Sequence, residues 1–198
     1  FRLDLTTLAA VQRIPGVVVS EAQTAQTGVI RMKVTEKPFD DPRIRKAIQL
    51  CSDNAENFEK SHRGMGAVAE NHHVAEIHPE YFALPPFKRN IEEARRLLKE
   101  AGHEEGLTLT CVVGNTQGTW EQDSCAILKN HLAEAGITMN ISVLPSAQYW
   151  ELWDKAPFSL TSWTHRPLGT MALSLAYRSG VPWNETSYSN PTFDKALD

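Results

Sequence analysis

The chain has 198 residues, of which 41% are hydrophobic and 22% charged, an ordinary globular balance. Its net charge of −4 argues against a nucleic-acid partner, because phosphate binding requires a basic surface. No apolar run approaches the roughly 20 residues of a membrane span. The first residues lack the charged leader and apolar stretch of a signal peptide, and there is no initiating Met, so we expect a piece of a longer protein.

Residues 1–36 predict a short helix around Leu5 and Leu8, followed by two strands, Val17–Val19 and Gly28–Val34. A helix should begin at Pro42, because Asp41 is a good N-cap and proline costs no hydrogen bond at the first helical position. Its apolar positions recur at helical spacing: Ile44, Ala47, Ile48 and Cys51. Residues 60–90 show little periodicity and predict a long loop.

The pattern after residue 90 alternates between helices and strands. Asn90 with Glu93 forms a capping box, which predicts a helix that ends at Gly102. The predicted elements that follow are a strand over 107–113, a helix over 119–135, a strand over 137–143, a helix from 146 to 153 and a strand over 158–163. Asn190-Pro191 opens a last helix. This order is typical of an α/β domain with crossover connections.

The three cysteines, Cys51, Cys111 and Cys125, each lie within an apolar pattern. None forms a CxxC pair, and an odd number cannot all pair within one chain. We expect buried thiols that pack as small hydrophobic groups. A disulfide between Cys111 and Cys125 remains open.

Several segments in order resemble one protein family. The stretch Pro-Phe-Asp-Asp-Pro-Arg-Ile-Arg-Lys-Ala at 38–47 resembles a landmark of the extracellular solute-binding proteins that serve peptide, oligopeptide and nickel ABC transporters. Further matches are NIEEARRLLKEAGH at 90–103, HLAEAGITMNISV at 131–143, the helix and strand over 149–163, and NPTFDKAL at 190–197.

The resemblance implies an α/β fold, a periplasmic-binding-protein-like (type II) lobe whose mixed sheet has flanking helices. Residues 1–198 would form a single lobe of a larger bilobal protein, with entry strands in 1–36, the family-matching segment in 37–198 and the other lobe absent. It also implies a monomeric, non-enzymatic, cofactor-free protein, peripheral to the membrane, that captures a peptide or peptide-like solute and delivers it to ABC permease subunits. Its expected location is the periplasm or, with a membrane anchor, the cell surface.

The loop after the strand that ends at Trp163 is the expected ligand site, because open α/β sheets bind ligands at strand carboxyl ends. Trp163 resembles an aromatic position that lines the family's cleft. The third residue after this Trp is Arg166, at a position that resembles one where the family's peptide-binding members carry an Asp. In those members the Asp anchors the α-amino group of the peptide. A cation there disfavours an ammonium and suits a carboxylate or phosphate. The candidate ligand-binding residues are Trp163, Arg166, Thr164, His165, Trp120 and Tyr177.

Weaker candidates follow the same loop: Arg178, Trp183 and Asn184. The sequence holds no catalytic constellation, and the His72–His78 stretch lacks the spacing of a zinc motif. Two alternatives remain open at this point: a metal-dependent hydrolase that uses the His72–His78 loop, and the ligand-sensing module of a regulator.

Overall fold

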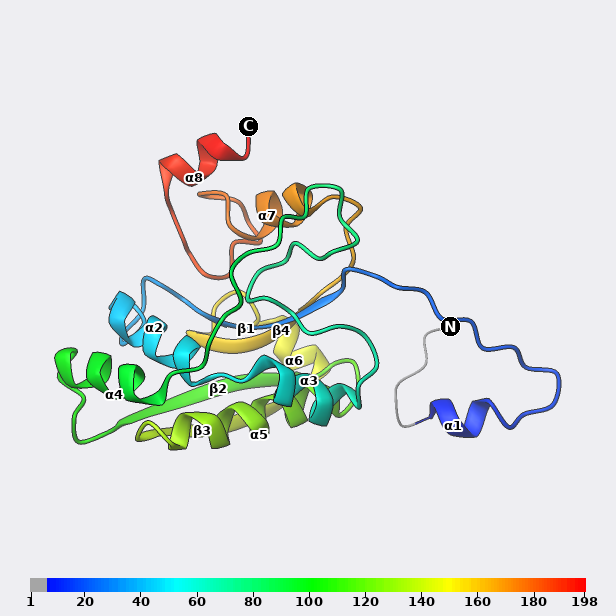
Figure 1. Cartoon of the computed structure of the whole chain (residues 1–198), viewed down its shortest axis with the longest axis horizontal. Coiled ribbons are helices and arrows are strands. Elements are labelled where there is room, and N and C mark those ends of the chain that lie inside the picture. The colour runs from blue at the N-terminus through cyan, green and yellow to red at the C-terminus, as the bar shows by residue number, and fades with distance from the viewer. Residues whose placement is uncertain (1–6) are drawn as a thin grey trace.

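The structure is a computed structural model and describes residues 7–198, which form a four-stranded mixed sheet with flanking helices (Figure 1). The strands are β1 (Thr27–Met32), β2 (Leu107–Asn115), β3 (Ile137–Pro145) and β4 (Phe158–Trp163). The helices are α1 (Leu8–Val11), α2 (Pro42–Cys51), α3 (Asn54–His62), α4 (Ile91–Glu100), α5 (Trp120–Ala133), α6 (Ser146–Trp150), α7 (Gly169–Ala176) and α8 (Pro191–Ala196). The expected α/β class and mixed sheet are confirmed.

The strand order is β1-β4-β2-β3. Strands β2, β3 and β4 run parallel, whereas β1 is antiparallel to β4, with Thr27 opposite Trp163. The start of β1 and the ends of the other three strands therefore lie at the same edge of the sheet. That edge is called the carboxyl edge below.

The hydrophobic core lies on the face of the sheet that α5 covers, with α2 and α4 packed beside it. Along β2, Leu109 and Cys111 are buried on that face, whereas Thr108 and Thr110 are exposed on the other. This alternation is the one expected of a strand with one covered face. The three cysteines are buried and free, and the sulfurs of Cys111 and Cys125 lie 3.9 Å apart.

The predicted helix starts are confirmed by their capping bonds. The Asp41 carboxylate accepts from the Arg43 N–H at 2.8 Å, and the Asn90 side chain accepts from the Glu93 N–H at 3.0 Å. The Asn190 side chain likewise caps α8. These helices begin where a side-chain oxygen satisfies amide groups that no helical carbonyl reaches.

Three expectations about elements need correction or lie outside the described residues, and two helices were missed. The strand at Val17–Val19 is wrong, because no partner strand lies beside it and Val18 is 87% exposed; β1 is the only strand among the described residues of the 1–36 entry segment. The helix around Leu8 is only the short α1, and Leu5 lies outside the described residues. The helix expected to reach residue 153 ends at Trp150. Helices α3 and α7 were not predicted; α3 takes up the first residues of the expected 60–90 loop.

Candidate functional site

The loop that follows β4 presents its polar side chains at the carboxyl edge. Thr164 and His165 are exposed and Arg166 is half-buried. Arg166 Nη1 donates to Thr164 Oγ1 at 2.8 Å and to the His165 carbonyl at 3.1 Å. The backbone N–H of Ala25 donates to His165 Nδ1 at 3.1 Å, which ties the loop to the segment before β1. The three loop residues predicted as ligand contacts therefore lie together and are accessible.

Trp163, in contrast, is a buried anchor of that loop, only 6% exposed. Its indole Nε1 donates to Glu185 Oε1 at 2.7 Å. The other oxygen of Glu185 accepts from Arg31 Nε at 2.9 Å and from Thr161 Oγ1 at 2.7 Å. The Trp163 N–H is thus already satisfied within the protein and is not free to bind a solute.

Arg31 and Glu185 form a buried ion pair, since each side chain is 3% exposed or less. The Arg31 guanidinium also donates to the carbonyls of Trp153 and Ala156, in the turn that leads into β4. The pair therefore joins β1, β4 and the segment before α8. Sequence reasoning missed both residues, because 154 positions separate them and no local pattern marks a long-range ion pair.

Residues 63–86, here called the strap, run from α3 across the molecule to the region of α7 (Figure 1). The ring of His73 lies edge-on to Trp163, with 5.4 Å between ring centroids, and its Nε2 shares a 3.0 Å hydrogen bond with Tyr177 Oη. Burial, reinforced by the neighbouring His72, lowers the pKa of His73 to about 4. Burial also raises the pKa of Tyr177. Both groups are therefore neutral at pH 7, and the Tyr177 hydroxyl is engaged by the strap.

Two further side chains fasten the strap to the loop and to α7. His78 Nε2 donates to the Arg166 carbonyl at 3.0 Å, while its Nδ1 accepts from the Ala75 N–H at 2.9 Å. Glu80 accepts from the Gly169 N–H and from Thr170 Oγ1 at the start of α7. The strap thus supports the backbone from which the Arg166 side chain projects.

Trp120 packs under the neighbouring part of the carboxyl edge. Its side chain is buried, with 4.8 Å between its ring centroid and that of His62, and its ring packs against the backbone of Gly28. Buried Glu121 accepts hydrogen bonds from Thr116 and from the Gln117 N–H, which holds the loop between β2 and α5. Trp120 therefore packs beneath the carboxyl edge as a buried structural residue.

The weaker candidates are mostly structural. Asn184 donates to the carbonyls of Arg178 and Tyr188, which closes its own turn, and the Arg178 side chain pairs with Asp198. Trp183 is 46% exposed, and its ring lies 6.2 Å from that of Trp163.

The histidines of the strap do not form a metal centre. Within residues 7–198 no group of three or more His, Cys, Asp or Glu side chains is arranged to hold an ion. His73 and His78 are engaged as described, and His72 lies beside Glu70 at 3.3 Å. The hydrolase alternative therefore finds no support in the described part of the chain.

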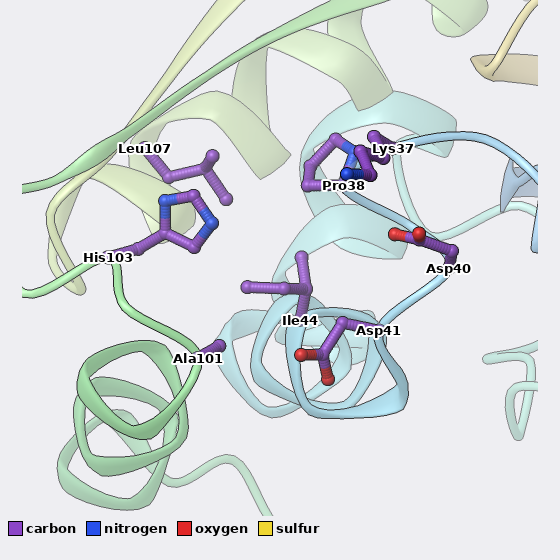
Figure 2. A pocket seen from close by; sticks show the side chains of 8 residues that line it. All are labelled: Lys37, Pro38, Asp40, Asp41, Ile44, Ala101, His103 and Leu107. Atoms are coloured by element: carbon purple, nitrogen blue, oxygen red, sulfur yellow. The ribbon is translucent and has the colours of Figure 1, made fainter.

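A separate pocket of about 400 Å³ opens at the opposite, amino end of β2 (Figure 2). It is lined by Lys37, Pro38, Asp40, Asp41, Ile44, Ala101, His103 and Leu107. The Arg43 side chain hydrogen-bonds Asp41 and lowers the pKa of that carboxyl to about 2. This carboxylate is committed to capping α2, and no predicted site residue lines the pocket.

No helix formed by residues 7–198 has both the length and the apolar character needed to cross a membrane.

Comparison with solved structures supports the fold. The chain superposes on Staphylococcus aureus NikA in complex with Ni(L-His)2 with a TM-score of 0.84 at 18% identity, covering 98% of this chain and 42% of that one. It superposes on Helicobacter pylori DppA in complex with the peptide STSA with a TM-score of 0.78 at 19% identity, covering 98% and 39%. Both are type II periplasmic binding proteins.

Sequence comparison identifies relatives and a family. The glutathione-binding protein GsiB of Pectobacterium atrosepticum is 27% identical over 186 residues, which cover 85% of this chain and 35% of that protein. GsiB of Escherichia coli K12 is 27% identical over 123 residues, covering 60% and 23%. The chain thus spans about a third or less of the length of these relatives. The model of the bacterial extracellular solute-binding proteins, family 5 middle region, matches residues 2–185, and the chain therefore belongs to this family.

Proposed function

We propose that the full-length protein is the substrate-binding component of an ABC importer, and that it captures a small peptide-like anion. Residues 1–198 would supply one lobe of a clamp whose second lobe closes over the solute. The observation that carries the proposal is the family match over residues 2–185, together with the accessible loop Thr164–Arg166 at the carboxyl edge. Open α/β sheets bind ligands at this edge.

The free hydrogen-bonding capacity of Arg166 supports an anionic solute. Only its Nη1 is bonded, to Thr164 and the His165 carbonyl; no described residue accepts from its Nε or Nη2. The guanidinium therefore keeps donors for the planar, two-point contact that suits a carboxylate. Relatives named glutathione-binding proteins fit this chemistry, because glutathione is a peptide-like molecule with two carboxylates.

The predicted contacts contribute in two ways. Thr164, His165 and Arg166 would touch the solute, whereas Trp163, Trp120 and Tyr177 support the surface from beneath. Closure of a second lobe would exclude water, which strengthens the polar contacts of Arg166. We place the protein in the periplasm or at the cell surface, as a monomer that hands its solute to permease subunits.

Isothermal titration of the full-length protein with a panel drawn from the relatives tests the proposal: glutathione, the neutral-side-chain peptide Ser-Thr-Ser-Ala, mannopinic acid and nickel with L-histidine. We expect glutathione to bind, and Arg166→Ala to weaken it about 10- to 100-fold, the range for a hydrogen bond to a charged group. Arg96→Ala, which removes an exposed arginine on α4, is the matched control. If glutathione and the other panel members all fail to bind, the proposal is wrong.

A further inference from the structure

Two cysteine side chains from neighbouring elements meet in the hydrophobic core. Cys111 lies on β2 and Cys125 on α5, the helix that covers this face of the sheet, and their Sγ atoms lie 3.9 Å apart. Both residues are 0% exposed. Among residues 7–198, which include all three cysteines, no other two cysteine sulfurs lie within hydrogen-bonding reach. Cys111 and Cys125 therefore form a pair from which Cys51, buried on α2, is separate.

The separation of 3.9 Å between the two sulfurs is that of two thiols in contact but not bonded. A disulfide bond is about 2.05 Å long, so the sulfurs would have to approach each other by about 1.9 Å. Rotation about the two Cα–Cβ bonds, which turns the sulfurs toward each other, supplies an approach of this size. Because β2 and α5 already pack against each other, the bond requires no change in the order or pairing of the elements.

The family to which the chain belongs favours the oxidised form of this pair. Its members are extracellular solute-binding proteins. Disulfides form and persist in proteins outside the cytoplasm, whereas cytosolic thiols are kept reduced. Two thiols in contact in an exported protein are therefore a candidate disulfide.

We propose that Cys111 and Cys125 form a disulfide in the exported protein, whereas Cys51 remains a free thiol. The inference goes beyond the proposed function and does not depend on the identity of the solute. The oxidant is itself a disulfide, either that of a thiol–disulfide oxidoreductase or oxidised glutathione. One cysteine thiolate attacks it to form a mixed disulfide, and the second thiolate then displaces the oxidant's sulfur. The oxidant leaves in its thiol form with the two electrons and the two protons of the cysteines.

This oxidation precedes the closing of the core. The thiolate is the reactive form of cysteine, and the hydrogen bond with Cys111, reinforced by burial, raises the pKa of Cys125 in the folded protein. The two cysteines are only 14 positions apart, and closing so short a loop costs little entropy. The completed bond would join the two ends of the turn between β2 and α5, which belongs to the carboxyl edge.

Peptide mapping of the full-length protein, recovered after export to the periplasm of an expression host, tests the pairing. The protein is unfolded, alkylated at its free thiols and digested with trypsin. Lys99 and Lys129 are consecutive cleavage sites, so peptide 100–129 holds both Cys111 and Cys125, whereas peptide 47–60 holds Cys51 alone. We expect peptide 100–129 without alkyl groups and two hydrogens lighter than its reduced form. Peptide 47–60 should carry one alkyl group.

Three controls identify the bond. Reduction before alkylation should place two alkyl groups on peptide 100–129. Chymotrypsin cleaves after Trp120, between the two cysteines, and the two fragments should stay joined until they are reduced. Cys51→Ala should leave the bond in place, whereas Cys125→Ala should leave Cys111 open to alkylation.

The result that would overturn the proposal is peptide 100–129 with two alkyl groups in exported protein that was not reduced, because both thiols are then free. A link from peptide 47–60 to either cysteine of peptide 100–129 would overturn it as well. Neither result bears on solute capture, which the titration with the solute panel measures separately.

Discussion

Removal of the Glu185 carboxylate should destabilise the protein strongly, although Glu185 lies in an irregular segment. In Glu185→Ala the Arg31 guanidinium loses its counter-charge in a position that is almost inaccessible to water. The same change leaves the Trp163 N–H and the Thr161 hydroxyl without their acceptor. Three donors from two strands are thus disturbed by one substitution.

The expected loss of unfolding free energy is about 3–5 kcal/mol, the range for breaking a buried ion pair by removing one partner. The bonds from Arg31 to the carbonyls of Trp153 and Ala156 survive and argue for the lower half of that range. Replacing both charges, in Arg31→Met with Glu185→Leu, should cost less than Glu185→Ala alone, because no uncompensated charge remains buried.

Urea unfolding followed by tryptophan fluorescence measures these differences, since Trp163 reports on the affected region. Glu104→Ala, which removes an exposed partner of Lys99, is the control and should have little effect. A loss below about 1 kcal/mol for Glu185→Ala, or a double variant less stable than the single one, would refute the reasoning about a buried charge.

Three further predictions concern packing, pH and capping. Gly28→Ala should lower the free energy of unfolding by about 1–3 kcal/mol in thermal unfolding, because a Cβ there would lie 2.7 Å from the Trp120 ring. Trp120→Phe in the same background should recover part of the loss, and equal stability of Gly28→Ala and the unaltered protein would contradict the crowding. Because burial lowers the pKa of His73 to about 4, the folded state binds fewer protons at this residue than the unfolded chain between about pH 6.5 and 4. The free energy of unfolding should therefore fall by up to about 3 kcal/mol as the pH falls through that window, relative to His73→Phe in urea unfolding, and parallel pH profiles of the two proteins would contradict this. Asn90→Ala should cost about 1 kcal/mol and Asn90→Ser much less, measured in the same way, because serine can still accept from the Glu93 N–H; equal losses would rule out the cap.

Local features of the sequence were sufficient to predict much of the fold. The starts of α2, α4 and α8 follow from a capping side chain at Asp41, Asn90 and Asn190, and each acts within three residues of chain. The strands β2 and β3 follow from alternation, because one of their faces is exposed. Val17–Val19 was mistaken for a strand, since β-branched residues indicate a strand only where a partner strand is available.

The candidate site was predictable only in outline. The resemblance and the strand-end rule located the loop Thr164–Arg166, and the structure shows these residues to be accessible. Neither could show that Glu185 occupies the Trp163 N–H, or that the strap covers Tyr177. Whether an aromatic side chain faces a solute or the protein depends on what packs against it.

The family, the order of most helices and strands, and the place of Arg166 after β4 could be predicted from the amino-acid sequence, because capping, alternation and motif order are properties of neighbouring residues. The tertiary structure decided which side chains remain free to bind. Gln26, Gln117 and Ser162 come together only when β1 pairs with β4 and the loop after β2 lies beside them. Arg31 and Glu185, 154 positions apart, form their ion pair for the same reason. Long-range contacts depend on the packing of the whole sheet, which no short stretch of sequence encodes.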